Sequence, residues 1–253
     1  MPSATKRYMG QNFLISEAVA TAESAHSIGK TVLEIGPGRG MLTKGLCKHA
    51  KRVIAVEKDA RLFTALKSVL QYRNLKLINK DFFEATESEL ELSKIDIVIA
   101  NVPYSMSSKI VMWLREHNIP AVLCLQKEFV EHMLAGEGTR NYSRLSVTCA
   151  LSFRITEIMK VPRSSFRPVP GVDSEVIFIK PKNTAITPKE DSIINMLMQH
   201  KKKMLRNAIL DSGINVTLYG GILPEETLQT RVFKMSPERL LAVAKSLNTF
   251  QKP

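Results

Sequence analysis

Apolar residues occur along the first two-thirds of the chain in short runs, separated by segments of helical periodicity. The apolar runs predict strands at residues 31–35, 52–57, 75–79, 95–100 and 121–125. Helices are predicted at residues 16–28, 59–70, 107–117 and 127–135, with Ser16 and Asp59 as N-caps. This alternation indicates an α/β fold with a doubly wound, mostly parallel, Rossmann-like sheet. Ligands of such sheets bind beyond the carboxyl ends of the strands.

The pattern changes in the last third of the chain. Between residues 145 and 179 the helical periodicity fades and β-branched residues alternate, which predicts antiparallel strands added at the sheet edge. A polar, proline-bounded stretch at residues 181–188 predicts a linker. Beyond it, residues 190–211 and 224–247 predict helices. We therefore expect a catalytic domain at residues 1–182 and a small helical domain at residues 183–253.

The 253-residue chain carries a formal net charge of +12, which points to a polyanionic partner. Nucleic acid is the first such partner, an acidic membrane surface the second, and a soluble protein with a basic surface is the alternative. Cys47, Cys124 and Cys149 are an odd number and predict buried, reduced thiols. No cysteine or histidine spacing indicates a zinc site, so no metal is expected. With no signal-peptide core or bilayer-spanning apolar stretch, we expect a cytoplasmic protein.

A glycine-rich turn follows the first long strand, in the sequence Glu34-Ile35-Gly36-Pro37-Gly38-Arg39-Gly40. Glycines there let the backbone bend tightly and approach a ligand closely. A dinucleotide site favours the spacing Gly-x-Gly-x-x-Gly, whereas here it is Gly-x-Gly-x-Gly. The carboxylate of Glu34 would repel a pyrophosphate but suits a cationic ligand. S-adenosylmethionine, which carries a sulfonium and an ammonium group, is therefore the expected cofactor.

Acidic residues also end the next two strands. Glu57 lies about 20 residues beyond the turn, where ribose hydroxyls need an acceptor. Asp81 follows the third strand and can accept from the adenine amine, while the neighbouring Phe82 can cover the ring. Each acid alone is more simply an ordinary helix cap or surface residue. Their succession at three strand ends favours a cofactor site.

The sequence Asn101-Val102-Pro103-Tyr104 follows the fourth strand. These residues suit the methylation of a substrate adenine at its exocyclic nitrogen. That nitrogen is a poor nucleophile, because its lone pair is delocalised into the ring. Preorganised acceptors aimed at its hydrogens favour the pyramidal geometry needed for attack. The side-chain oxygen of Asn101 and a backbone carbonyl held by the rigid Pro103 can be these acceptors. Tyr104 offers a face on which the base can stack, worth about 1–3 kcal/mol.

With these motifs assembled, the chain resembles the KsgA-type family of small-subunit rRNA adenine dimethyltransferases over nearly its whole length. The resemblance rests on the turn and strand ends above and on three further segments. These are Gln11-Asn12-Phe13-Leu14, similar to the cofactor-lid motif; Phe166-Arg167-Pro168-Val169-Pro170-Gly171-Val172-Asp173-Ser174, similar to the Phe-x-Pro-x-Pro-x-Val-x-Ser signature; and Lys201-Lys202-Lys203-Met204-Leu205-Arg206-Asn207, similar to the basic helix of the C-terminal domain. Val102 replaces the commoner leucine, a mild change in volume. The short second domain and the Gly220-Gly221 turn resemble the archaeal branch.

The resemblance implies a class I S-adenosylmethionine-dependent methyltransferase. Nothing in the sequence suggests an obligate dimer, so a monomer is expected. It implies N6,N6-dimethylation of two adjacent adenosines in a hairpin loop near the 3′ end of small-subunit rRNA, with a role in small-subunit biogenesis. It also implies that Tyr104 and Phe166 sandwich the target base. The expected catalytic set is Asn101, Pro103, Tyr104 and Phe166. The expected cofactor-binding set is Asn12, Leu14, Glu34, Gly36, Gly38, Glu57, Lys58, Asp81, Phe82 and Asn101.

Two of these assignments have simpler alternatives. Phe166 lies among prolines, which exclude a helix and predict an exposed, stiff loop that presents the ring to a flipped base. Alternatively, the ring plugs the edge of the sheet. Lys201, Lys202, Lys203 and Arg206 cluster without nearby acids, which favours phosphate contacts over a merely solvated helix face.

Other functions remain open at this point. The same chemistry could act on another RNA, as in the large-subunit rRNA methyltransferases that confer macrolide resistance, or on DNA. The fold could also serve as a ribosome-assembly or nucleic-acid-binding factor without activity, although intact Asn101 and Tyr104 argue against that. The spacing of the glycines and the presence of Glu34 disfavour a nicotinamide oxidoreductase.

Overall fold

The computed structural model describes residues 12–214 and 223–249, and the chain divides into two compact units. The first unit comprises the chain up to Phe129 together with Ile155–Pro181. The second comprises Val130–Arg154 together with the chain from Lys182 onward. Residues 130–154, which sequence analysis assigned to the first domain, therefore pack with the C-terminal helices. The Gly220-Gly221 turn and Gln11 lie outside the described residues.

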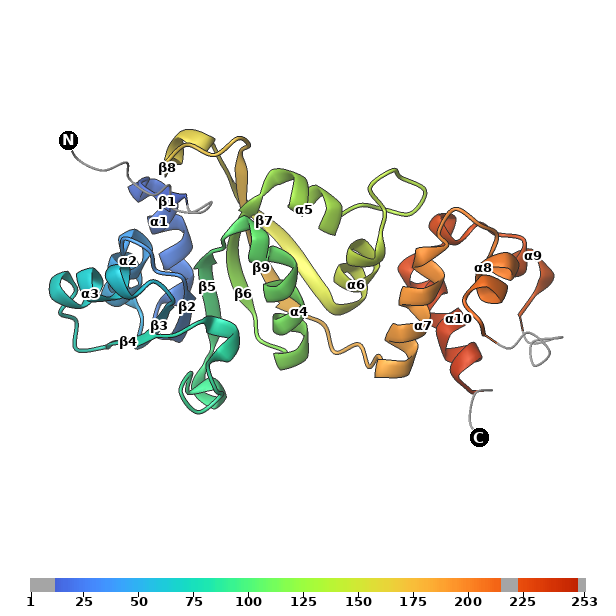
Figure 1. The fold of residues 1–253 in the computed structure, drawn as a ribbon, viewed down its shortest axis with the longest axis horizontal. Helices are drawn as coiled ribbons and strands as arrows, with labels where there is room; N and C mark the ends of the chain where they lie inside the picture. The colour runs from blue at the N-terminus through green and yellow to red at the C-terminus, as the bar shows by residue number, and fades with distance from the viewer. Residues whose placement is uncertain (1–11, 215–222, 250–253) are drawn as a thin grey trace, which may run out of the picture. The chain divides into compact units, whose positions relative to one another are not determined.

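A seven-stranded sheet organises the first unit, and Figure 1 shows its strands side by side. Its order is β4 (Leu75–Asn79), β3 (Arg52–Glu57), β2 (Thr31–Ile35), β5 (Ile97–Asn101), β6 (Ala121–Gln126), β9 (Ser174–Pro181) and β7 (Phe153–Val161). The first five strands are parallel, and β9 is antiparallel to β6. The predicted α/β class with a mostly parallel sheet is confirmed.

The strand order changes direction at β2. The chain runs from β2 outward through β3 to β4, and then returns to place β5 on the other side of β2. Loops leaving β2 and β5 therefore diverge to opposite sides, which opens a crevice at the carboxyl ends of these two strands. The glycine-rich turn leaves β2 and the Asn-Val-Pro-Tyr sequence leaves β5, so both motifs reach this crevice.

Two helices contribute to the apolar core on one face of the sheet. Helix α1 (Glu17–Ser24) begins at Ser16, whose hydroxyl accepts from the Val19 amide, and α2 (Met41–His49) follows the glycine-rich turn. The two helices pack closely because Gly45 lacks a side chain: a Cβ there would lie 2.9 Å from the Ser24 hydroxyl. The core cluster they share with the strands includes Val19, Ala20, Val32, Leu42, Leu46, Val53, Ile97, Ile99, Val122, Cys124 and Val176.

The other elements of this unit lie close to their predicted positions. They are α3 (Ala60–Val69), capped by Asp59, α4 (Ser107–His117) and the start of α5 (Lys127–Met133). The short strands β1 (Phe13–Leu14) and β8 (Phe166–Arg167) were not predicted. Asn101 was expected just after its strand, but it is the last residue of β5 and pairs with Cys124 of β6. The sheet therefore fixes the backbone of Asn101.

The second unit is helical, and Figure 1 shows two of its helices, α7 and α10, side by side. Its elements are α6 (Arg144–Ser152), α7 (Pro188–Gln199), α8 (Leu205–Asp211), α9 (Glu225–Leu228) and α10 (Pro237–Thr249). The expectation of strands from residue 145 is wrong for α6. A capping box between Ser143 and Ser146 starts this helix, and Val147 and Leu151 enter the apolar core with α7 and α10.

The predicted helix at residues 190–211 is broken between α7 and α8. The backbone of residues 201–205 forms hydrogen bonds with residues 230–233 instead of continuing the helix: Leu205 N donates to Thr230 O, and Val232 N donates to Lys203 O. The predicted helix at residues 224–247 is likewise divided, by a turn around Val232 and by Pro237 at the start of α10. Within the described ranges, no helix has both the length and the apolar character needed to cross a bilayer.

Candidate active site

A large pocket lies at the carboxyl ends of the parallel strands in the first unit. Its lining includes most of the predicted residues: Asn12, Gly36, Gly38, Glu57, Lys58, Asp81, Phe82, Asn101, Pro103, Tyr104 and Phe166. Leu14 and Glu34 line a smaller pocket that shares Asn12, Gly36, Gly38 and Asn101 with the large one. The fold thus brings together every residue that the sequence nominated for catalysis or cofactor binding.

The glycine-rich turn forms one wall of the pocket. Gly36 and Gly38 adopt left-handed backbone angles, with φ of 68° and 57°, which residues with a side chain rarely adopt. A Cβ on Gly36 would meet no atom within 4 Å, whereas one on Gly38 would lie 3.1 Å from the ring of Phe13. The first glycine therefore leaves open space for a ligand, and the second admits the aromatic ring.

Glu57 connects this turn to the end of β3. One of its carboxylate oxygens accepts from the Gly38 amide at 3.1 Å, and the other accepts from the Asp59 amide at 2.9 Å. Burial raises the pKa of Glu57, and these two backbone hydrogen bonds oppose the rise. Each oxygen keeps a second lone pair, so the carboxylate can still accept from the hydroxyls of a ligand.

Asp81 and Phe82 lie at the end of β4. Asp81 forms an ion pair of 2.7 Å with Lys58 and accepts from the Phe83 amide, and the hydrogen bond from Lys58 is the main cause of its lowered pKa. Phe82 is buried and meets the ring of Trp113 edge to face, with the centroids 4.9 Å apart. This contact fixes the phenyl ring at the edge of the pocket.

Glu34 is the most confined acid of the strand-end set, with 1% of its surface exposed. One of its carboxylate oxygens accepts from the Thr43 hydroxyl at 3.1 Å, and the other has no hydrogen-bond partner among the described residues. Burial is the main cause that raises the pKa of Glu34 to about 8, and the nearby carboxyls of Glu23 and Glu57 add to it. A buried acceptor without a donor is suited to a cationic ligand.

Asn101 presents a second acceptor of this kind. Its amide NH₂ group donates to a carboxyl oxygen of Glu23 at 3.1 Å. The side-chain carbonyl oxygen of Asn101 is shielded from solvent and, within residues 12–214 and 223–249, has no donor. Since unmatched buried acceptors are costly, this oxygen is available for a donor on a bound molecule.

Tyr104 follows at the start of a short 3₁₀ turn, with Pro103 as the N-cap. The Pro103 carbonyl accepts from the Met106 amide at 2.8 Å, which closes the turn. The hydroxyl of Tyr104 lies 3.3 Å from that of Ser174, at the start of β9. Burial is the first cause of the raised pKa of Tyr104, so the phenol stays protonated.

Phe166 also lines the pocket, but it does not lie in an exposed loop as expected. It is 4% exposed and belongs to strand β8, where it pairs with Leu14 of β1. Pairing with β1 satisfies the backbone of this proline-flanked segment, and the ring joins the apolar core that contains Leu14. The ring thus packs in this apolar core and also lines the pocket.

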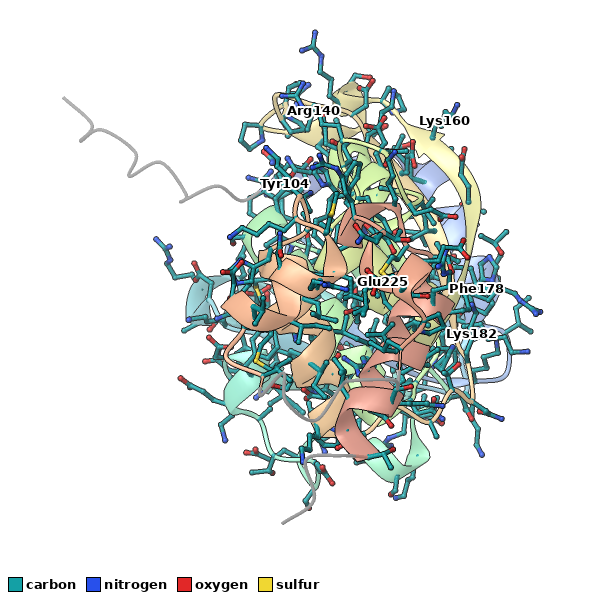
Figure 2. The ribbon with its side chains drawn as sticks, turned by 90° about the vertical axis from the view of Figure 1, so that its right-hand side faces the viewer. Tyr104, Arg140, Lys160, Phe178, Lys182 and Glu225 are labelled. Carbon is teal, nitrogen blue, oxygen red and sulfur yellow. The ribbon has the colours of Figure 1, made fainter. Side chains whose placement is uncertain are left out.

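The basic cluster of the second unit lies mostly in the turn between α7 and α8, not on one helix. Lys201 donates to the Tyr142 carbonyl, and Lys203 forms an ion pair of 2.6 Å with Asp211. Arg206 pairs with Glu225, which Figure 2 labels and which lies in the first turn of α9. The side chain of Lys202 is exposed. Most of these cations therefore have intramolecular partners.

Sequence reasoning did not identify Glu23 or Ser174 as site residues. Glu23 lies four residues after Val19 and three after Ala20, so it falls on the apolar face of α1, and an acid at such a position was a detectable anomaly. Ser174 ends a recognised motif, but its partner became visible only when β9 was placed beside β6. Cys124, predicted as a buried thiol, is buried and lines the pocket.

Comparison with known proteins identifies one family. The sequence profile described as "Ribosomal RNA adenine dimethylase" matches residues 3–248. A relative from the archaeon Methanopyrus kandleri, named "Probable ribosomal RNA small subunit methyltransferase A", is 36% identical over 263 residues, covering 96% of this chain and 92% of the relative.

Solved structures agree with that match. The crystal structure of a dimethyladenosine transferase from Plasmodium falciparum has a TM-score of 0.81 and 27% identity, and covers 94% of this chain and 98% of that one. The 23S rRNA methyltransferase ErmE has a TM-score of 0.64 and 22% identity, and covers 94% of this chain and all of that one. At that identity the likeness to ErmE concerns the fold alone.

Proposed function

The chain belongs to the ribosomal RNA adenine dimethylase family, and we propose that it dimethylates N6 of two adjacent adenosines in a hairpin loop near the 3′ end of small-subunit rRNA. The observation that carries this proposal is the side-chain oxygen of Asn101, which has no hydrogen-bond partner among the described residues and lies at the end of β5, in the same pocket as the glycine-rich turn and Tyr104. This oxygen is an acceptor for an exocyclic amine.

The pocket residues fit S-adenosylmethionine as the methyl donor. The carboxyl oxygen of Glu34 that has no partner among the described residues matches a cationic group, and the open space at Gly36 admits a ligand against the backbone. Glu57 would accept from ribose hydroxyls, Asp81 from the adenine amine, and Phe82 would cover the ring. Asn12, Leu14, Gly38 and Lys58 complete the proposed binding set. When bound, the cofactor supplies an electrophilic methyl group on a sulfonium, and the neutral thioether that remains after transfer is a good leaving group.

Asn101 and the backbone beside it prepare the target amine. The Asn101 oxygen would accept from one N6 hydrogen. Because the Pro103 carbonyl is directed at the Met106 amide within the turn, we assign the second acceptor to the Val102 carbonyl, which the proline ring holds in place. Two fixed acceptors favour a pyramidal nitrogen and need no rearrangement during attack. The methylated amine is acidic and loses its proton readily, so no strong general base is needed.

Aromatic rings would hold the base in position. Tyr104 and Phe166 both line the pocket, and we propose that they stack on opposite faces of the flipped adenine. Phe166 is anchored by its pairing with Leu14, and Tyr104 by its contact with Ser174. Rigid positioning for in-line transfer can supply several kcal/mol of the reduction in the barrier.

We further propose that the chain works as a monomer on small ribosomal subunits or their precursors, in the cytoplasm. The net charge of +12 supports a polyanionic substrate. In this proposal residues 1–182 bind the cofactor and catalyse, and residues 183–253 contact rRNA through Lys201, Lys202, Lys203 and Arg206. Because three of these cations have intramolecular partners, they would exchange or share those partners on binding.

The test is methyl transfer to undermethylated small subunits. Purified protein is incubated with labelled cofactor and the particles, and the labelled nucleoside is identified by mass spectrometry. We expect dimethyladenosine with the wild-type chain and at least about 100-fold slower formation with Asn101→Ala. Large ribosomal subunits and double-stranded DNA serve as parallel substrates. Label confined to either of them would overturn the proposed substrate, and salt-sensitive binding without any label would favour a non-catalytic assembly factor.

A further inference from the structure

A carboxyl group is buried beneath the catalytic asparagine of the proposed reaction. Glu23 lies in the last turn of α1, is 0% exposed, and accepts from the Asn101 NH₂ group at 3.1 Å. None of the described lysine, arginine or histidine side chains forms an ion pair with it. Burial is the main cause that raises the pKa of Glu23 to about 8.

This position is unfavourable for an acid in two ways. Burial without a cation penalises the charged form. The C-terminal end of a helix carries a partial negative charge, which repels a carboxylate. An apolar residue at this site, between the strands and α1, would remove both costs. An acid at this position, with Asn101 as its hydrogen-bond partner among the described residues, therefore indicates a role that concerns Asn101.

Asn101 needs something to fix the orientation of its amide. The carbonyl oxygen and the NH₂ group of an asparagine have nearly the same shape, and rotation by half a turn exchanges them. Only one orientation is useful here, because a target amine donates hydrogens and needs an acceptor. With the NH₂ group bonded to Glu23, the carbonyl oxygen lies on the other side of the amide and is left for a ligand.

Resting on the proposed function, we propose that Glu23 is a positioning residue: its carboxyl oxygen holds the Asn101 NH₂ group and so presents the Asn101 carbonyl oxygen to the adenine amine. An ionised carboxylate can only accept, so it permits one orientation of the amide. A protonated carboxyl can also donate, and it then tolerates the reversed, unproductive orientation, so the productive orientation becomes more favoured as the pH rises and Glu23 ionises. The titratable groups that interact electrostatically with Glu23 are Glu34 on β2 and Cys124 on β6.

The orientation is measurable without substrate. We would record the side-chain NH₂ signal of Asn101 by NMR in protein labelled with ¹⁵N-asparagine, assigned by its loss in Asn101→Ala. In wild-type protein this signal should shift as the pH passes the Glu23 pKa of about 8. Glu23→Gln should remove this titration, whereas Glu17→Gln, an exposed position on the same helix, should retain it. If Glu23→Gln titrates like the wild type, Asn101 responds to another group and the proposal fails.

Turnover distinguishes positioning from a structural role. Glu23→Gln and Glu23→Met should lower kcat on small subunits on the order of tenfold, with the KM for the cofactor changed less than about twofold. Glu23→Met should also unfold at a higher temperature than the wild type at about pH 8, because no buried carboxyl remains to ionise. A stable Glu23→Met variant with full kcat would overturn the proposal.

These experiments test the proposed substrate and the role of Glu23 separately. If the wild-type chain leaves small subunits unlabelled, the proposed substrate is wrong, and the NMR titration still decides whether Glu23 holds Asn101. If the wild type is active and both Glu23 variants match it in kcat, the proposed function stands and the role of Glu23 is overturned.

Discussion

The hydroxyl groups of Tyr104 and Ser174 lie 3.3 Å apart, although 70 residues separate them in the chain. Tyr104 follows the parallel strand β5, and Ser174 begins the antiparallel strand β9, with β6 between the two strands. The antiparallel addition to the sheet therefore reaches back to the pocket and contacts the ring proposed to stack on the base.

The first prediction separates the ring of Tyr104 from its hydroxyl. Tyr104→Phe keeps the ring and loses one partly buried hydrogen bond worth about 1 kcal/mol, so kcat/KM should fall less than about fivefold. Tyr104→Ala loses the stacking face, worth about 1–3 kcal/mol, and should lose from about fivefold to about 150-fold. Single-turnover methylation measures both values. Ser174→Ala is the matched control for the hydroxyl contact. Equal losses in Tyr104→Phe and Tyr104→Ala would show that the hydroxyl, and not the ring, contributes the binding energy.

The second prediction concerns the two methyl transfers. Before the first transfer the amine has two hydrogens, and both acceptors are useful; before the second it has one hydrogen, and a methyl group must fit beside one acceptor. Asn101→Ala should therefore reduce both steps but unequally, with losses on the order of 100-fold or more, as for other preorganised groups. Mass spectrometry of single-turnover products resolves the mono- and dimethylated nucleosides. Equal losses at both steps would contradict this account.

The third prediction concerns Gly38. An alanine there would adopt φ near 57° and bring its Cβ to 3.1 Å from the ring of Phe13. The left-handed backbone alone costs about 1–2 kcal/mol, and a shift of Phe13 would also disturb the pocket wall. Gly38→Ala should lower Tm by several degrees, at about 2–4 °C per kcal/mol, and weaken cofactor binding. Gly136→Ala, in open space, is the control for the substitution itself. An unchanged Tm and cofactor affinity in Gly38→Ala would refute the prediction.

The fourth prediction follows from the proton on Glu34. Its pKa is raised from the usual 4.5 to about 8, so the free protein holds this proton near pH 7. A cationic ligand beside the carboxyl favours the ionised form, and cofactor binding at pH 7 should release up to about one proton. Calorimetry in two buffers with different ionisation enthalpies measures this release. Glu34→Gln should abolish most of it and weaken binding.

The same group affects stability in a defined direction. Between the unfolded pKa of 4.5 and the folded pKa of about 8, the folded state holds a proton that the unfolded state has lost. The contribution of Glu34 to the free energy of unfolding is fully present below pH 4.5 and falls as the pH rises, by up to about 1.4 kcal/mol per pH unit. Glu34→Gln should therefore gain stability relative to the wild type as the pH rises through this window. A difference that is constant with pH would contradict the assignment.

The sequence predicted the parallel strands well, because each is a short run rich in apolar residues. In β2, β3, β5 and β6 almost every residue is buried, which leaves little choice of structure. It failed where tertiary contacts outweigh local pattern. The β-branched residues of α6 favoured strands, but Val147 and Leu151 are buried by packing against α7 and α10. The helix break at Lys201–Lys203 depends on hydrogen bonds from residues 230–233, which no local window contains.

The candidate site was predictable to the extent that its residues end strands. Glu34, Glu57 and Asn101 occupy the carboxyl ends of parallel strands, and a Rossmann-like order brings such ends together. Glu23 could not be assigned in the same way, since its function depends on which strand α1 covers. Phe166 was placed in an exposed loop because its pairing with Leu14 joins segments from opposite ends of the first unit.

The fifth prediction distinguishes two adjacent lysines of the proposed RNA-binding cluster. Lys201 donates to the Tyr142 carbonyl, and Tyr142 is fully buried in the core of the second unit. Lys201→Ala should therefore lower the free energy of unfolding, by about 1–3 kcal/mol.

Lys202 is exposed, so Lys202→Ala should leave stability unchanged within about 0.5 kcal/mol. Lys202→Ala should instead weaken the salt dependence of RNA binding. The slope of the logarithm of the binding constant against the logarithm of the salt concentration should fall in magnitude by about one, because one phosphate contact is lost. Filter binding of small-subunit rRNA across salt concentrations, combined with urea unfolding of each variant, separates the two roles. An unchanged salt slope in Lys202→Ala would remove this lysine from the RNA interface, and the rRNA contacts of the second unit would then have to come from other cations.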